Sequence, residues 1–158
     1  MTSYFNVAIK FYNSSWDNSI PFEFVFYPLP NSRGWTATAF SNVAQSAIPT
    51  SLTDYNGLLS VIFHEIFHIL YDEESLALKK DIEQWRACNP SKSRHYAFGL
   101  LNESLATALD NGYVSAKLNG KENEGNWYGQ KYISQMAKKI YPMVKEYIEK
   151  GQSIDKAF

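Results

Sequence analysis

The sequence has a single cysteine, Cys88, among its 158 residues, which excludes an internal disulfide. Opposite charges nearly balance at a formal net charge of −1, so nothing in the composition indicates a surface for nucleic acid or anionic membranes. Low-complexity tracts and internal repeats are absent. A hydrophobic content of 45% is typical of one compact domain, 1–158, that buries its core without disulfides.

Long apolar segments are also scarce. The longest run, from Leu58 to Tyr71, contains Glu65 and falls short of the roughly 20 apolar residues that a membrane-spanning helix needs. No basic and then apolar segment follows Met1, so the sequence predicts no signal peptide. These absences favour a soluble protein and leave its compartment open.

The first fifty residues favour strands. Two runs rich in aromatic and branched residues, Tyr4–Tyr12 and Phe22–Tyr27, flank a turn-like segment, and Trp35–Phe40 indicates a third strand. We therefore expect an α+β fold, in which a small and mostly antiparallel sheet over 1–50 is followed by a helical half over 51–158.

Four segments of the second half have helical periodicity. They are Leu58–Tyr71, Glu74–Cys88, Ala97–Asn111 and Trp127–Lys150. The third helix should end near Gly112, after a loop from Pro90 to Arg94. Pro142 should kink or divide the last helix, because proline removes a backbone hydrogen bond.

The most informative motif is His64-Glu65-Ile66-Phe67-His68, which reads H-E-x-x-H inside the apolar run. On a helix, His64 and His68 project from one face a turn apart, so two imidazole nitrogens can meet one metal ion. Burying these unpaired polar groups costs several kcal/mol, and a divalent cation offsets that cost. The motif therefore predicts a metal site.

A catalytic zinc ion usually takes three protein ligands, so a third donor is required. The H-E-x-x-H-x-x-G-x-x-H pattern fails, because Tyr71 and Glu74 occupy the glycine and histidine positions. His95 and Glu103 are the alternatives, and about 12 Å of helix would separate them, so they do not serve the same ion. We favour Glu103 because it lies within a helix, although its periodicity also fits a solvent-facing side chain.

A second motif supports this choice. Asn102, Glu103 and Ala106 match N-E-x-x-[SA], and with the upstream H-E-x-x-H this resembles the gluzincin metallopeptidases, which are thermolysin-like in plan. The resemblance implies a zincin-like fold, one catalytic zinc ion on His64, His68 and Glu103, and hydrolysis of peptide bonds. It rests on the two motif helices.

The resemblance also implies a mechanism. The metal activates a water molecule and Glu65, rotated by about 100° from its neighbouring histidine, acts as general base. A serine or thiol route has little support, since Cys88 is the single cysteine and no G-x-S-x-G pattern occurs. An oxyanion donor is also expected, with Tyr113 favoured, His95 second, and Arg94 and Tyr128 as further candidates.

The sequence departs from the family pattern at Thr107, where an aspartate often orients a ligand histidine. Asp72 and Asp110 are the candidates for that role, and we favour Asp72. Both residues are equally compatible with ordinary helix-end or surface acids.

Substrate binding is the least determined part of the sequence. In the resembled family an edge strand pairs with the peptide substrate, which would assign that role to Trp35, Ala37 and Ala39, although an ordinary strand fits equally well. A chain this small would need a partner or a further domain to complete a deep cleft. The alternative functions are a non-catalytic peptide- or protein-binding module, which the intact Glu65 disfavours, and a zinc hydrolase of a non-peptide amide.

Overall fold

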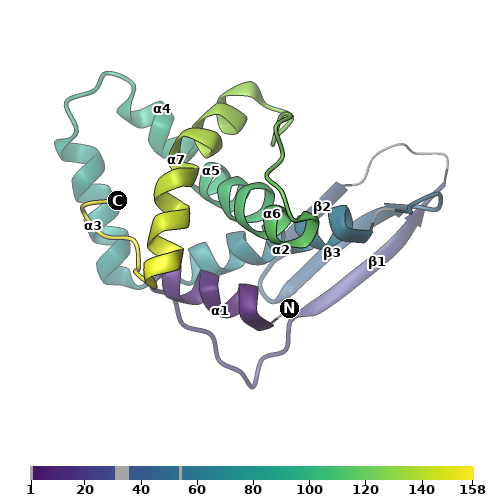
Figure 1. The fold of residues 1–158 in the computed structure, drawn as a ribbon. Helices are drawn as coiled ribbons and strands as arrows, with labels where there is room; N and C mark the ends of the chain where they lie inside the picture. The colour runs from purple at the N-terminus through teal and green to yellow at the C-terminus, as the bar shows by residue number, and fades with distance from the viewer. Residues whose placement is uncertain (1, 31–35, 54) are drawn as a thin grey trace.

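The structure is a computed structural model that describes residues 2–30, 36–53 and 55–158. A three-stranded sheet and a mainly helical second half confirm the predicted α+β fold. In Figure 1 the sheet lies at one end of the molecule, and helices α3 (Leu76–Cys88) and α4 (Arg94–Gly99) lie towards the other.

The sheet consists of β1 (Glu23–Leu29), β2 (Thr36–Phe40) and β3 (Val43–Pro49) in the order β1-β3-β2. The central strand β3 pairs in parallel with β1 and antiparallel with β2, so the sheet is mixed rather than mostly antiparallel. The strands predicted at β1 and β2 are confirmed. The sequence did not predict β3, because its alanine, glutamine and serine residues have weak strand propensity.

The segment Thr2–Phe11 is helix α1, so the strand predicted over Tyr4–Tyr12 was wrong. Its aromatic and branched composition suggested a strand, but its buried residues, Ala8, Phe11 and Tyr12, recur at helical spacing. α1 packs against α2 (Tyr55–Asp72), which matches the predicted motif helix. The helical spacing of the buried residues is therefore a better guide to the structure of this segment than its composition.

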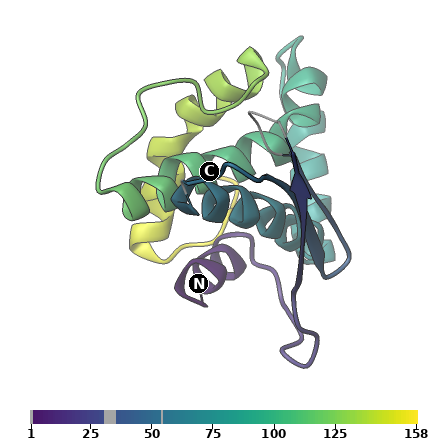
Figure 2. The same ribbon diagram turned by 90° about the vertical axis from the view of Figure 1, so that its right-hand side faces the viewer.

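Helix α2 connects the two halves of the molecule. It contacts β2 and β3 on one side and α1 and the helices that follow Leu100 on the other. Figure 2, in which the sheet is seen nearly edge on, shows α2 lying beside it. No helix in the described ranges combines the length and hydrophobicity required to cross a membrane.

The helix that carries Glu103 differs from its prediction at both ends. It begins as α5 (Leu101–Thr107), after a break at Leu100, and continues as the π-helix η1 (Ala108–Val114) and as α6 (Ser115–Asn119). The predicted end near Gly112 was therefore wrong. The segment ends at Gly120, whose φ of 71° is a left-handed conformation that glycine adopts without strain.

Gly112 instead serves a close contact with α7 (Lys131–Lys150). A Cβ atom at Gly112 would lie 2.5 Å from the Tyr141 ring and 3.1 Å from Trp127, so only glycine fits between them. Pro142 lies inside α7, which continues unbroken to Lys150, so of the two predicted effects of this proline, a kink or a division, the division does not occur. The predicted start of this helix at Trp127 was wrong, because α7 begins at Lys131.

Candidate metal centre

The polar side chains of the H-E-x-x-H motif are buried on α2, except that His68 is partly exposed. His64 and Glu65 are each 9% exposed, and the Nε2 atoms of His64 and His68 lie 2.9 Å apart. Residues four apart on a helix share one face, which is why the two imidazoles converge. The rest of α2 is mainly apolar and packs into the core. α2 therefore supplies two nitrogen donors to one point.

Helix α5 brings Glu103 to the same point. One carboxylate oxygen lies 3.4 Å from His64 Nε2 and the other 3.3 Å from His68 Nε2. The donor atoms of the three residues all lie within 4.8 Å of one another, so the group could hold a metal ion. The predicted convergence of these side chains is confirmed, whereas the binding of a metal stays a prediction.

A second side chain orients each imidazole through its other nitrogen. His64 Nδ1 lies 3.1 Å from Asp110 Oδ2, and His68 Nδ1 lies 2.9 Å from Asn102 Oδ1. Both oxygens accept hydrogen bonds, so each Nδ1 donates a proton and Nε2 is the ring atom that faces the convergence point. The role of Asn102 had not been predicted, although its place beside Glu103 in the second motif was the available signal.

Asp110, rather than the favoured Asp72, is the aspartate that contacts a histidine. Asp110 is 3% exposed and lies in η1, whose π-helical turn shifts residues away from regular 3.6-residue spacing. Asp72 is exposed at the end of α2, and no described hydrogen bond joins its carboxylate to a histidine. The sequence could not anticipate this, because it gave no sign of the π-helix.

Asp110 is held by donors other than His64. The backbone N–H of Asn111 donates to Asp110 Oδ1, and the Asn111 side chain donates to the same oxygen at 2.7 Å. Burial raises the pKa of Asp110, and the hydrogen bonds from His64 and Asn111 oppose that shift. Three N–H groups face its carboxylate, and each favours the ionised form.

The donor set fits a divalent cation. Two imidazole lone pairs and a carboxylate meet at about 3 Å, and such groups repel one another unless a proton or a cation lies between them. Glu103 Oε2 is buried and makes no hydrogen bond of good geometry within the described part of the chain. Two histidines and one glutamate form a ligand set that zinc uses in catalytic sites.

The electrostatics agree with this arrangement. Burial disfavours the charged form of His64, but its hydrogen bond to Asp110 and the facing Glu103 carboxylate outweigh it and raise the pKa of His64 to about 10. The facing His64 and His68 imidazoles hold the pKa of Glu103 well below its usual range. Burial raises the pKa of Glu65. The acids around His64 therefore create a site that favours positive charge.

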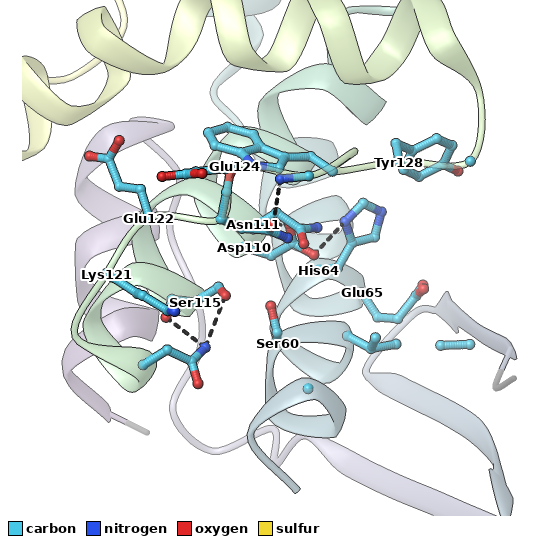
Figure 3. Close-up of a pocket in the computed structure, with 18 residues that line it drawn as sticks. Ser60, His64, Glu65, Asp110, Asn111, Ser115, Lys121, Glu122, Glu124 and Tyr128 are labelled. Atoms are coloured by element: carbon cyan, nitrogen blue, oxygen red, sulfur yellow. Dashed lines mark hydrogen bonds and ion pairs between the residues drawn. The ribbon is translucent and has the colours of Figure 1, made fainter. Parts of the chain in front are cut away.

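Tyr128 is the candidate oxyanion donor that lies at the site. Its ring stacks on the His64 ring with centroids 6.1 Å apart. Figure 3 shows the two side chains next to one another. Burial and the nearby Glu103 carboxylate raise the pKa of Tyr128 to about 12. The sequence named Tyr128 without favouring it, because Tyr128 lies in an irregular segment whose path no periodicity reveals.

The two favoured oxyanion donors, Tyr113 and His95, lie away from the triad. The Tyr113 ring packs edge-on against Tyr4, with centroids 6.4 Å apart, and the His95 ring lies 3.1 Å from the Arg86 guanidinium. Neither residue, nor Arg94, lines the cavity beside the triad. Tyr113 is turned away because the helix continues through Gly112 rather than ending there.

A cavity of about 900 Å³ adjoins His64 and Glu65. One wall is the amino-terminal half of α2, the opposite wall is η1 with α6, and the segment from Lys121 to Gly129 borders it (Figure 3). Ala37 of the edge strand β2 also lines it. Ala39 lies on the same strand but is not part of this lining, and Trp35 lies outside the described residues.

Neither protein-family models nor curated proteins nor solved structures contain a match to the chain.

Proposed function

We propose that the chain is a zinc-dependent metallopeptidase of the gluzincin type. The observation that carries the proposal is the convergence of His64, His68 and Glu103 within 4.8 Å, with Glu65 next to them on a cavity wall. A purely structural zinc site has four protein ligands and no use for an adjacent base. Three donors with a glutamate beside them suit catalysis.

The proposed ligand atoms are Nε2 of both histidines and the Glu103 carboxylate. Asp110 and Asn102 keep the imidazoles in the required tautomer and orientation. A zinc ion bound there would acidify a water molecule and polarise the carbonyl of the scissile bond. Asp110 would also increase the electron density on the His64 ring through its hydrogen bond.

Glu65 is the proposed general base. It follows His64 directly and is turned by about 100° around α2, so its carboxylate faces the cavity instead of joining the triad. From there it would take a proton from the attacking water and pass it to the leaving amine. No covalent intermediate with the protein is required.

Tyr128 is the proposed donor to the oxygen that becomes negative in the transition state. Its raised pKa keeps the phenol protonated at neutral pH, and its position over His64 places the hydroxyl beside the reaction site. Such a donor typically contributes about a hundredfold or more to kcat. Ala37, at the edge of the sheet, would lie along the path of the substrate backbone.

The test combines metal analysis with a quenched fluorescent peptide library. We expect zinc to co-purify with the protein, a chelator to abolish cleavage, and Glu65→Gln to abolish cleavage while zinc is retained. His64→Ala and Glu103→Ala should lose zinc, whereas His95→Ala should keep it, because His95 lies away from the triad. Zinc binding without cleavage of any peptide would instead support a binding module or a hydrolase of other amides.

A further inference from the structure

The cavity beside the metal centre is lined by more acidic than basic side chains. Its described lining contains four carboxylates and one ammonium group, from Glu65, Asp110, Glu122, Glu124 and Lys121. His64 faces the Asp110 carboxylate at 3.1 Å, so that pair adds little net charge. The remaining acids give the cavity a negative potential, which attracts a cationic ligand group and repels an anionic one.

Glu122 and Glu124 carry the part of this charge that lies away from the general base. Both belong to the segment between α6 and α7 that borders the cavity, and in Figure 3 they lie on the side away from Glu65. Glu122 forms an ion pair with Lys145, whose Nζ lies 3.2 Å from Oε1. The Glu124 carboxylate makes no ion pair with a described residue, so its charge is the more available to a ligand.

The backbone that carries these two acids is anchored to α7. Lys138 Nζ donates to the carbonyl oxygens of Glu124, at 3.1 Å, and Gly125, at 2.5 Å, and lies over the Trp127 ring. Trp127 is itself buried, and its indole N–H donates to the Asn123 carbonyl. The acids therefore hold their places beside the cavity before a ligand binds, which lowers the entropic cost of binding.

An independent observation indicates that a ligand enters the same cavity. Glu65 lines it and is 9% exposed, yet its carboxylate makes no hydrogen bond to a described residue. A buried polar group normally has a partner. The cavity is therefore expected to admit a molecule that supplies one.

We propose that Glu122 and Glu124 select peptide substrates that carry arginine or lysine next to the scissile bond. With the reacting carbonyl at the metal centre, the flanking side chain extends along the cavity and its N–H groups donate to the two carboxylates. Arginine is favoured over lysine, because its planar guanidinium can bond one carboxylate through two N–H groups. This inference rests on the proposed peptidase function and assigns its substrate class.

The test measures kcat/KM of the zinc-loaded protein for matched peptides with arginine, lysine, citrulline or glutamate at each position flanking the scissile bond. Citrulline resembles arginine in shape but has no charge. We expect the native protein to prefer arginine over citrulline about tenfold at one such position, and the preference should fall as the salt concentration rises.

Variants of the two acids assign the preference to them. Glu124→Gln should reduce it about threefold, and Glu122→Gln should reduce it less, because Lys145 already neutralises part of the Glu122 charge. The double variant should abolish the preference and leave kcat/KM for the citrulline peptide within about twofold of the native value. Glu149→Gln is the matched control, since Glu149 is also exposed but lies on α7 outside the lining.

Each outcome separates this inference from the peptidase proposal. Cleavage without a preference for arginine or lysine, or a preference that the double variant retains, overturns the acidic subsite and leaves the peptidase standing. A preference for glutamate overturns it in favour of Lys121. Failure of the zinc-loaded protein to cut any peptide overturns both.

Discussion

Two regions along α2 differ in how their buried polar groups are paired. One is the group of imidazoles near the middle of the helix, and the other is Glu74 just beyond its end. Near the middle of the helix, each imidazole nitrogen faces a partner, from Asp110, Asn102 or Glu103. Just beyond its end, Glu74 is 6% exposed and its Oε2 has no hydrogen-bond partner among the described residues. The partners of His64 favour its charged form, whereas burial disfavours the charged form of Glu74.

The second region includes an aromatic hydroxyl. Tyr12 is fully buried beside Tyr71, its hydroxyl makes no described hydrogen bond, and burial raises its pKa well above the usual value. Burial likewise raises the pKa of Glu74 to about 7. The contrast teaches that burial alone does not identify a functional site in this molecule, whereas burial with converging partners does.

The largest expected effect is that of His64→Ala on the metal-free protein. The change leaves Asp110 buried without its imidazole and should lower the free energy of unfolding by about 3 kcal/mol. Urea denaturation at pH 6 with a chelator present measures it. His95→Ala, at an exposed position, should change stability by less than about 0.5 kcal/mol. Equal changes in the free energy of unfolding for His64→Ala and His95→Ala would show that the pairing around His64 contributes nothing to stability.

Asp110→Asn should weaken zinc binding by about 10–100-fold, because the amide orients His64 without supplying negative charge. Competition with a chromophoric chelator gives the affinity. Asp72→Asn provides the matched control and should leave the affinity unchanged, since Asp72 is exposed. If Asp72→Asn has the larger effect, the assignment of the orienting aspartate is incorrect.

Glu74→Gln should stabilise the protein at pH above 7 by about 2 kcal/mol. The folded-state pKa of about 7 lies above the ordinary 4.5, so the folded protein binds the proton more tightly. The wild type therefore loses stability as pH rises from 4.5 to 7, and the loss is complete above 7. Urea midpoints of the wild type and the variant from pH 4 to 8.5 should diverge over that window.

The exposed neighbour Glu73 supplies the control for this series. The stability of Glu73→Gln should depend on pH in the same way as the stability of the wild type. A pH dependence of stability unchanged in Glu74→Gln would refute the unpaired state of that carboxyl.

The smallest effect concerns tyrosine hydroxyls. Tyr12→Phe removes a hydroxyl that has no partner and should leave stability unchanged or raise it by about 1 kcal/mol. Tyr147→Phe removes a hydroxyl that donates to Asp155 at 2.8 Å and should lower stability by about 1 kcal/mol. Thermal unfolding of both variants provides the comparison, and a loss of stability in Tyr12→Phe would show that its hydroxyl is paired.

The sequence predicted the parts of the site that depend on local helical geometry. The spacing of His64 and His68 fixes their common face, and the second motif singled out Glu103, which lies beside both imidazoles. The sequence failed where a backbone irregularity decides the outcome. Asp110 reaches His64 from a π-helix, and no residue pattern distinguishes that turn from an α-helix.

Tertiary packing accounts for the other differences. β3 is buried at the centre of the sheet although its residues have weak strand propensity, because β1 and β2 both pair with it. Tyr128 reaches the site from an irregular segment held in part by Trp127, whose indole N–H donates to the Asn123 carbonyl at 2.6 Å. Such placements depend on contacts between distant segments, which a single sequence does not display.

The most direct test of the central claim is the zinc content of the purified chain after zinc loading and exhaustive dialysis. The account predicts about one zinc ion per chain for the wild type and for Glu65→Gln, and almost none for Glu103→Ala. Zinc retained equally by Glu103→Ala, or absent from the wild type, would contradict the convergence of His64, His68 and Glu103 on one metal.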